Sequence, residues 1–249
     1  MTQKQQIENH EELSGKRIVV LGGSSGIGLS VAQQVVAQGG RAIIASSNAD
    51  RVEQAMATLD GKAEGYTLDL SNERDIQTVF QKIGSFDHLV FTAGDTLQLN
   101  ALEATDLTKA RQAFELRYWA ALAAVKYAIP QIRKDGSIVL TTGIAGQRPR
   151  KGWTVAASIC GTIEALTRAL AVELAPIRVN AVSPGVVRTN LWNNMQEQDR
   201  EAMYESVGKQ LLVGRVGEAR EIARAYLFLM QEGYSTGRTI VLDGGALLT

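Results

Sequence analysis

The sequence is poor in residues that bind metals or form cross-links: it has one cysteine and two histidines in 249 positions. A single cysteine, Cys160, excludes a disulfide within the chain and is typical of a reducing compartment, so we expect a cytoplasmic protein. His10 and His88 lie far apart and cannot form a zinc site of familiar spacing with one cysteine, so we expect no metal. We interpret His88, in the run FDHLVF, as a residue at the start of a strand.

An excess of charge of either sign is also missing. The chain has 26 basic and 26 acidic side chains, which argues against nucleic acid or an anionic membrane surface as a partner. We find no apolar run of the roughly 20 residues that a membrane-spanning helix needs. Residues 1–13 are polar and lack the apolar core of a signal peptide, so we expect a flexible arm. Residues 14–249 are long enough for a single α/β domain with a buried core.

What the chain does have is a regular alternation of short apolar runs and amphipathic runs of helical length. The expected strands cover 17–21, 41–45, 63–68, 88–92, 137–142, 177–182 and 238–242. These strands are apolar on both faces, as in a parallel sheet covered by helices. The pattern predicts a Rossmann-type α/β fold, a doubly wound parallel sheet of about seven strands in three layers. Residues 190–213 break the alternation, and we expect them to form a helical lid.

A glycine-rich turn, LGGSSGIG at 21–28, joins the first expected strand to the first helix. Gly22 permits a tight turn, while Gly26 and Gly28 let the backbone approach a pyrophosphate at the helix N-terminus. Such a turn alone is a weak signal, because a generic tight turn explains it too. The residues it assigns to a dinucleotide are Gly22, Ser24, Ser25, Gly26, Ile27 and Gly28.

Three later motifs strengthen this interpretation, since each follows an expected strand. They are Asp69-Leu70, Thr92-Ala93-Gly94, and Pro184-Gly185 with Val187 and Thr189. With these motifs, the chain from about residue 13 to the C-terminal VLDGG resembles the short-chain dehydrogenase/reductase family. The resemblance implies that the first motif holds adenine and that the last holds the nicotinamide carboxamide.

The end of the second expected strand distinguishes NADP(H) from NAD(H). NAD binders usually place a carboxylate there for the ribose 2′-hydroxyl. This chain has Ser46, Ser47 and Asn48, with Arg51 shortly after. These side chains suit a 2′-phosphate, so NADP(H) is preferred over NAD(H). An alternative is that Arg51 lies on the exposed face of its helix.

The family's proton chemistry depends on a serine, a Tyr-x-x-x-Lys pair and an asparagine. The segment 136–185 follows the family's frame closely, and its matching positions hold Gly143, Ala156 and Cys160. The place of the asparagine falls on Arg117. The resemblance therefore implies an atypical member that lacks all four residues. Ala156 and Cys160 lie one helical turn apart, with Trp153 just over one turn earlier.

Arg117 is our candidate replacement, because a guanidinium stabilises a developing oxyanion without losing a proton. Thr142 is our candidate for orienting a carbonyl. Alternatively, Arg117 pairs with a carboxylate across a subunit contact, and Thr142 is a solvated hydroxyl. Tyr118 and Tyr204 are other possible donors. Cys160 is either a nucleophile or inert packing.

The surroundings of the pocket suggest a small-molecule substrate that is apolar or aromatic. The expected lid carries Leu191, Trp192, Met195 and Met203, although packing within the lid explains them as well. Arg148, Arg150 and Lys151 follow the fifth strand, where they either attract an anionic substrate or form a solvated loop. In the family, the helices expected at 105–129 and 153–175 pair between subunits, which implies a homodimer or homotetramer.

Three functions follow from these observations. The first is an NADPH-dependent oxidoreductase acting on an activated carbonyl, an enone or a quinone. The second is a non-catalytic NADP(H)-binding sensor or regulatory protein, which the missing residues favour. The third is a lyase or isomerase that uses the fold as a pocket without redox chemistry.

Overall fold

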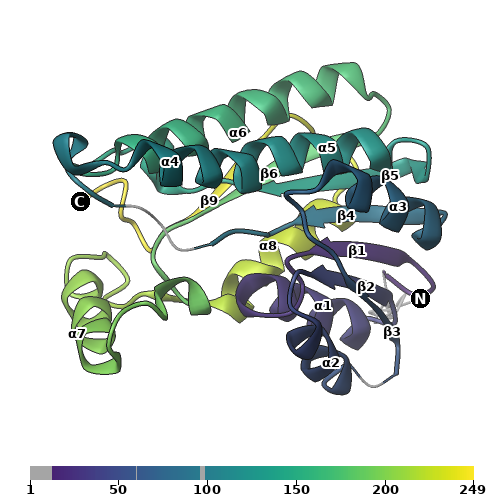
Figure 1. Ribbon diagram of the computed structural model, residues 1–249. Helices are drawn as coiled ribbons and strands as arrows, with labels where there is room; N and C mark the ends of the chain where they lie inside the picture. Colours follow the sequence, from purple (N-terminus) through teal and green to yellow (C-terminus); the bar gives the residue numbers. More distant parts are fainter. Residues whose placement is uncertain (1–12, 60, 96–98) are drawn as a thin grey trace, which may run out of the picture.

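The computed structural model describes residues 13–59, 61–95 and 99–249. Its centre is a parallel sheet of seven strands in the order β3-β2-β1-β4-β5-β6-β9, as Figure 1 shows. The strands are β1 (Arg17–Leu21), β2 (Arg41–Ser46), β3 (Ala63–Thr67), β4 (Phe86–Phe91), β5 (Ile132–Thr141), β6 (Arg178–Pro184) and β9 (Thr239–Leu242). This is the Rossmann-type doubly wound sheet that the sequence predicted. Apart from its last residue, the predicted N-terminal arm lies outside the described residues; Leu13 is buried in the core rather than part of a free arm.

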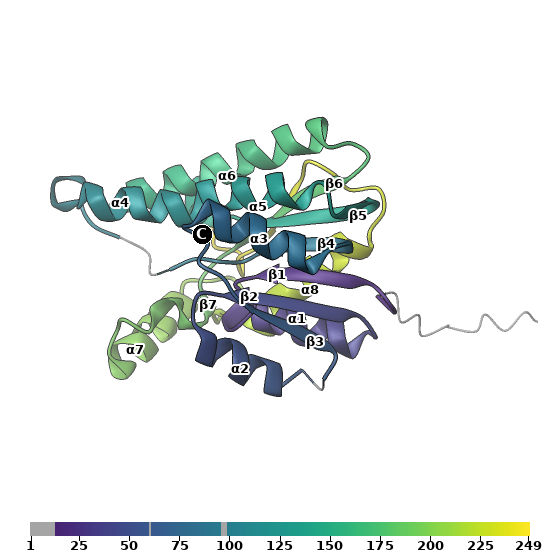
Figure 2. The same ribbon diagram turned by 45° about the vertical axis from the view of Figure 1, so that its right-hand side comes forward.

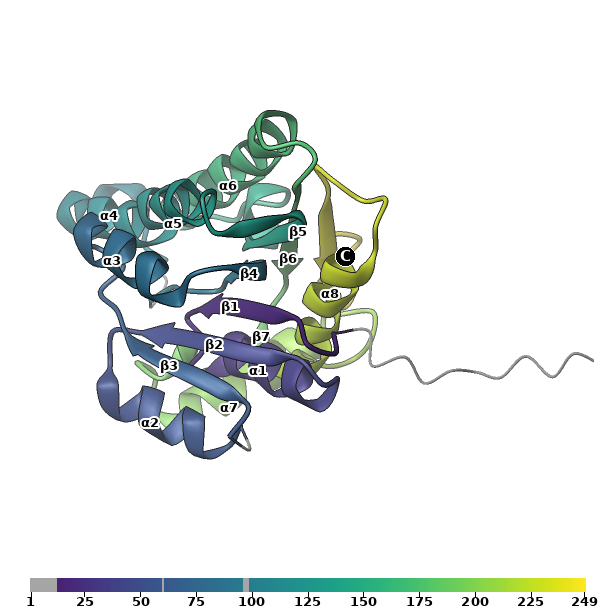
Figure 3. The same ribbon diagram turned by 90° about the vertical axis from the view of Figure 1, so that its right-hand side faces the viewer.

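Helices cover both faces of the sheet and complete the three layers (Figures 1 and 3). One face carries α1 (Gly26–Ala37), α2 (Ala49–Ala57) and α8 (Ala219–Gln231). The other face carries α3 (Glu73–Ile83), α4 (Leu107–Phe114), α5 (Ala120–Ala128) and α6 (Thr154–Glu173). The strands alternate between the two cores, since Val19 and Leu21 face one and Ile18 and Val20 face the other. Each fully buried aliphatic side chain contributes about 1.5 to 3 kcal/mol to this arrangement.

The predicted lid contains a short 3₁₀ turn at Asn190–Trp192 and the helix α7 (Glu197–Gly208). Two short parallel strands, β7 (Val187–Arg188) and β8 (Gly217–Glu218), join it to the rest of the fold. Figures 1 and 2 both show α4 and α7 on opposite sides of the same end of the sheet. A large cavity lined by the described residues lies at this end.

Among the described residues, α6 is long and apolar enough, by length and composition, to cross a membrane. The sequence expectation that no such run exists was therefore wrong on this measure. Core helices share these properties, and α6 packs its buried face, including Ile163 and Leu170, against the sheet. Its place in the helical layer accounts for its apolar composition.

His88 lies inside β4, which begins at Phe86, two residues earlier than predicted. Its Nδ1 is 2.9 Å from Ser137 Oγ, and both side chains are buried. Burial lowers the pKa of His88 to about 4, although the neighbouring Asp87 carboxylate acts in the opposite direction. The residue thus has a structural role as an uncharged hydrogen-bonding partner within the sheet.

This buried histidine predicts a loss of stability in mild acid. Its pKa is about 4 in the folded chain and 6.5 when unperturbed, so the unfolded chain binds the proton more tightly. Stability is therefore fully present above pH 6.5 and falls by about 3 kcal/mol as the pH falls to 4. Denaturant unfolding between pH 7 and 4.5 measures this loss. A His88→Asn variant keeps a polar partner for Ser137 without a titrating ring and should show a shallower slope; equal slopes would contradict the assignment.

Candidate functional site

A cavity of about 740 Å³ lies at the carboxyl ends of the central strands. Ligands of doubly wound sheets bind at this edge, where the strand order reverses on either side of the first strand. The wall of the cavity is formed by segments that follow β1 to β6 and by the start of the lid. The volume lies in the range of small-molecule and cofactor sites.

The glycine-rich turn forms the base of the cofactor half. Gly22 has φ +85°, and a Cβ there would lie 2.6 Å from the backbone nitrogen of Ala93. A Cβ on Gly28 would collide with Gly22 O and Thr92 Oγ1. The helix α1 begins at Gly26, and Ser25 before it makes no side-chain cap. The first N–H groups of α1 are thus available to an anion, as a pyrophosphate requires.

Nearly all residues that the sequence assigned to the cofactor line this cavity. They are Gly22, Ser24, Ser25, Gly26, Ile27, Gly28, Ser46, Ser47, Arg51, Asp69, Leu70, Thr92, Ala93, Gly94, Pro184, Gly185, Val187 and Thr189. Asn48 is the exception. Its Oδ1 accepts a hydrogen bond of 2.8 Å from Arg51 N, so the side chain caps α2 instead of lining the cavity.

At the far end of this half, the carboxylate of Asp69 is held in place by its own turn. Its Oδ1 accepts hydrogen bonds from Ser71 Oγ at 2.7 Å and from Ser71 N at 2.9 Å. These bonds lower the pKa of Asp69, the side-chain bond contributing most. Asp69 is therefore a fixed, ionised acceptor at the rim.

Arg117 lies at the other end of the cavity, in a π-helical turn at Glu115–Trp119 between α4 and α5. Such turns are rare and often occur at functional sites. The guanidinium lies against Gly94, where a Cβ would be 2.7 Å from Nη1. Nη2 donates to the backbone carbonyl of Asp95, and Nε lies 3.7 Å from Asp95 Oδ1. Burial lowers the pKa of Arg117 and Asp95 raises it, yet an arginine remains protonated.

The positions that match the family's serine, tyrosine and lysine also meet at this end. Gly143, Ala156 and Cys160 all line the cavity. A Cβ on Gly143 would lie 3.3 Å from Cys160 Sγ, so the sulfur occupies the space beside this glycine. Burial raises the pKa of the Cys160 thiol, and the thiol is therefore neutral near pH 7.

Thr142 lines the cavity, but its hydroxyl is already engaged. Oγ1 donates a 3.0 Å hydrogen bond to the backbone carbonyl of Cys160. The oxygen retains lone pairs with which to accept a hydrogen bond. To orient a carbonyl by donation, the residue must first give up its bond to α6.

The other candidate donors do not line the cavity. Tyr118 stacks edge-on against Trp119, with ring centroids 4.9 Å apart. Tyr204 is a buried residue of the lid helix α7, with the Arg188 guanidinium 4.4 Å from its ring centroid, and burial raises its pKa. Both tyrosines therefore contribute to packing.

The basic loop after β5 is also absent from the lining residues. Arg148 donates to the backbone carbonyl of Ala246, and the Arg150 guanidinium lies 5.5 Å from the ring centroid of Trp153. These two side chains have structural partners instead of facing the cavity. Lys151 is exposed.

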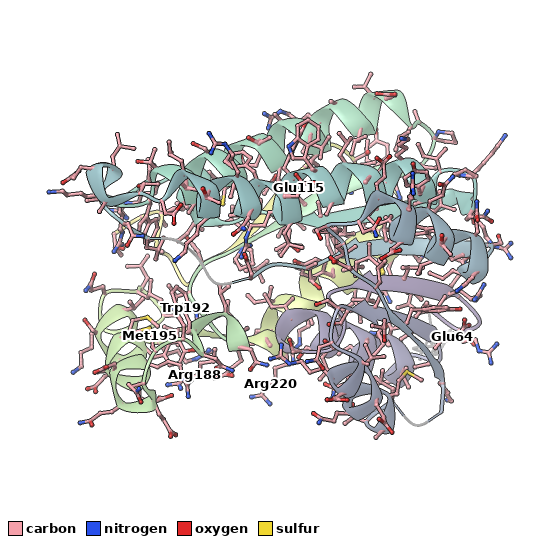
Figure 4. The ribbon with its side chains drawn as sticks, viewed as in Figure 1. Glu64, Glu115, Arg188, Trp192, Met195 and Arg220 are labelled. Atoms are coloured by element: carbon pink, nitrogen blue, oxygen red, sulfur yellow. The ribbon has the colours of Figure 1, made fainter. Side chains whose placement is uncertain are left out.

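The lid contributes part of what the sequence suggested. Leu191 and Trp192 line the cavity, whereas Met203 packs on the cluster around Tyr204 and Met195 is not among the lining residues. Figure 4 shows Trp192, Met195 and Arg188 gathered at the lid, far from Glu64 on β3.

Several lining residues were not identified from the sequence. They are Leu68, Ser71, Asp95, Leu99, Leu116, Thr141, Ile144, Ala145, Val186, Asn190, Asn193 and Asn194. The position of Asp95, directly after the motif that ends β4, was the signal available for it. The run NLWNN at 190–194 likewise places three amides at the start of the lid. Within the ranges described above, no three His, Cys, Asp or Glu side chains gather in a way that would hold a metal ion.

Comparison with known proteins identifies the family. The model of the family described as "Enoyl-(Acyl carrier protein) reductase" matches residues 22–246. A short-chain dehydrogenase/reductase of Stachybotrys chlorohalonatus is 37% identical over 95% of this chain and 98% of its own length. The chain belongs to the short-chain dehydrogenase/reductase family. The relatives found in this family are described as dehydrogenases and reductases.

Solved structures of this family share the whole fold. A small-chain dehydrogenase in complex with NADPH is 40% identical, with a TM-score of 0.85 over 95% of this chain and 100% of its own. The MalC Reductase/Diels-Alderase from Malbranchea aurantiaca is 29% identical, with a TM-score of 0.90 over 96% of this chain and 99% of its own. The short-chain dehydrogenase/reductase fold predicted from the sequence is thus confirmed.

Proposed function

We propose that this protein is an NADPH-dependent oxidoreductase with an atypical reaction centre that reduces an activated carbonyl, an enone or a quinone. The observation that carries the proposal is the Arg117 guanidinium, which lines the cavity beside three residues that cannot replace the family's acid. Gly143 and Ala156 have no proton to donate, and Cys160 is a neutral thiol with no fixed charge. An activated acceptor needs less help from a proton donor than a simple ketone does.

NADP(H) fits the residues at the cofactor end. Ser46, Ser47 and Arg51 line the cavity after β2, where a carboxylate would favour NAD(H). The hydroxyls and the guanidinium suit a 2′-phosphate. In support, one solved relative is in complex with NADPH. Titration of the protein with NADPH and NADH tests the preference, which equal affinities would contradict.

When bound, the reduced nicotinamide supplies the hydride. The residues of the protein stabilise the charge on the acceptor and exclude water. Arg117 has five donor hydrogens, and its hydrogen bond to the carbonyl of Asp95 uses one of them, on Nη2. The other N–H groups are available to stabilise negative charge on the acceptor oxygen as the hydride arrives. Trp153, Leu191 and Trp192 give apolar walls that exclude water and suit an aromatic acceptor.

The test is NADPH oxidation with a panel of quinones, diketones and enones, followed at the nicotinamide absorbance band. Turnover by the native chain is expected. The Arg117→Met variant keeps the bulk of the side chain without its charge, and its kcat should fall by about 10²-fold because one oxyanion donor is lost. Arg117→Lys, which keeps the charge but not the planar fork, should retain part of the rate.

Arg41→Ala is the matched control, because Arg41 is exposed at the start of β2, away from the cavity. It should leave turnover unchanged. Full activity of Arg117→Met would remove the role assigned to Arg117. Tight NADPH binding without turnover on any acceptor would instead favour the sensor. Conversion of a substrate without NADPH oxidation would favour the non-redox reading; one relative's name pairs a reductase with a Diels-Alderase.

We also propose a homodimer or homotetramer that pairs through the outer face of α4, α5 and α6. Apolar side chains are exposed there, among them Leu107, Trp119 and Val172. Burial of this surface against a second copy would remove it from water. Light scattering on the purified chain tests this, and a monomer would contradict it.

For the location of the protein in the cell, we propose a reducing compartment such as the cytoplasm. Imaging of a tagged chain tests this proposal.

A further inference from the structure

We infer that Asp95 determines specificity: by pairing with Arg117 it restricts the cavity to uncharged acceptors and excludes anionic ones. The inference rests on the proposed function, because it deepens the role of Arg117 at the same site. Nothing in the family pattern of glycine turn, strand-end motifs and reaction centre assigns a role to this position.

Asp95 is placed to do this by the end of β4. It follows Gly94 directly and lines the cavity together with Arg117. Two contacts join the residues: Nη2 of Arg117 donates to the Asp95 backbone carbonyl, and Nε lies 3.7 Å from Oδ1. The Arg117 side chain is 20% exposed and the Asp95 side chain is 53% exposed. The carboxylate is therefore accessible from the cavity while the guanidinium is largely enclosed.

A guanidinium without this partner would be a carboxylate site. Its planar fork matches carboxylate geometry with two parallel hydrogen bonds, and partial burial strengthens the attraction. The small space left by Gly94 lets the fork lie flat against the backbone, since a Cβ there would lie 2.8 Å from Cζ. An anionic acceptor, such as a 2-oxo acid, would then be drawn to Arg117.

Asp95 offsets this attraction of anionic acceptors to Arg117. The cavity is lined by two arginines and two aspartates, and Arg51 and Asp69 belong to its cofactor end. At the reaction end, Asp95 and Arg117 are the charged lining residues, and they cancel each other. An anionic acceptor meets the exposed carboxylate of Asp95 and gains no net attraction, because like charges repel. A neutral carbonyl still receives hydrogen bonds from the guanidinium and avoids the repulsion.

The experiment compares Asp95→Asn with the native chain on a matched pair of acceptors, methyl benzoylformate and benzoylformate. The two share one activated ketone and differ by a negative charge. In the native chain, kcat/KM should favour the ester. In Asp95→Asn, the preference should shift toward the acid by about tenfold, because the repulsion is gone and the Arg117 guanidinium keeps its bond to the backbone carbonyl but loses its ion pair. Asp135→Asn is the charge-matched control: its carboxylate is exposed at the start of β5, 3.8 Å from Lys16 Nζ, and its loss should not move the ratio.

A binding measurement supplies a readout that does not depend on turnover. Calorimetric titration of benzoylformate into each protein saturated with NADP⁺ should show binding to Asp95→Asn and none to the native chain. The gain should disappear in Asp95→Asn combined with Arg117→Met, because the guanidinium is the binding group. Melting temperature and NADPH affinity of each variant confirm that it is folded.

The outcomes separate this inference from the proposed function. If the native chain reduces the ester and Asp95→Asn shows the same ratio and no binding of the acid, the specificity role is wrong and the oxidoreductase stands. If no variant turns over either acceptor, or any quinone, diketone or enone of the panel, but Asp95→Asn gains binding of the acid through Arg117, the specificity role stands and the oxidoreductase is wrong. If Asp135→Asn shifts the ester-to-acid ratio of kcat/KM by as much as Asp95→Asn does, the effect comes from the overall charge of the protein, and the inference is overturned.

Discussion

Replacing Gly28 with alanine is expected to destabilise the fold by about 3 kcal/mol or more and to weaken NADPH binding by at least about 100-fold. A Cβ at this position would collide with Gly22 O and Thr92 Oγ1. The first of these atoms is backbone in the turn that forms the base of the cofactor site, so the turn must move. Because α1 starts from the same turn, its free N–H groups would leave the position in which they meet a pyrophosphate.

Gly161→Ala is the matched control, because it makes the same chemical change on α6. A Cβ there meets no atom within 4 Å, and the backbone is helical. This variant should be neutral or stabilised by up to about 1 kcal/mol, the usual preference for alanine in a helix. Denaturant unfolding and fluorescence titration with NADPH measure both effects. Normal NADPH affinity in Gly28→Ala would show that the turn is not the cofactor cradle.

Installing serine, tyrosine and lysine at 143, 156 and 160 should confer ordinary ketone reduction, with a gain of about 10²- to 10⁴-fold over the native chain. The three positions line one wall of the cavity, and Ala156 and Cys160 are one helical turn apart. A tyrosine at 156 would enter the cavity, and a lysine at 160 would lower the pKa of the tyrosine hydroxyl. Cyclohexanone is a suitable test acceptor because it is not activated.

The geometry also predicts the order in which these changes can be made. A Cβ at 143 lies 3.3 Å from Cys160 Sγ, so Gly143→Ser alone forces the sulfur to move and should destabilise the chain. Removing the sulfur with Cys160→Ala should relieve that cost. The triple variant with phenylalanine in place of tyrosine is the control for the proton donor, and it should gain nothing. A folded, NADPH-binding triple variant without ketone reduction would count against the assignment of these positions.

The fold and the cofactor half were predictable because they depend on repeating features of the chain. The run RIVVL at 17–21 is β1 in the structure, with its residues buried in alternate cores. The glycines of the turn were identifiable because a Cβ at Gly22 or Gly28 does not fit. Boundaries were less certain: β5 begins at Ile132, five residues before the predicted start, because Ile132 already pairs with Phe86 and the polar run RKDG lies in the irregular stretch before the pairing resumes at Ser137.

The misses concern single residues whose role depends on their neighbours in space. Asn48 looked like a ligand of the 2′-phosphate, but an asparagine before a helix also caps it, and the structure shows the cap. Asp95 is one carboxylate in a loop, and its role depends on its contact with Arg117, which only the structure shows. The hydroxyl of Thr142 reaches α6 rather than remaining free, which no pattern within residues 137–142 could indicate.

The π-helical turn at Glu115–Trp119 has a consequence for insertions and deletions in this helix. A π-helical turn holds one residue more than an α-helical turn, so removing one residue there would restore a regular α-helix while α4 and α5 keep their orientation. The small residues of α5 would stay on the sheet, but the side chains within the turn would change direction and Arg117 would move away from Gly94. A single deletion in this turn should therefore preserve the fold and remove the guanidinium from the cavity.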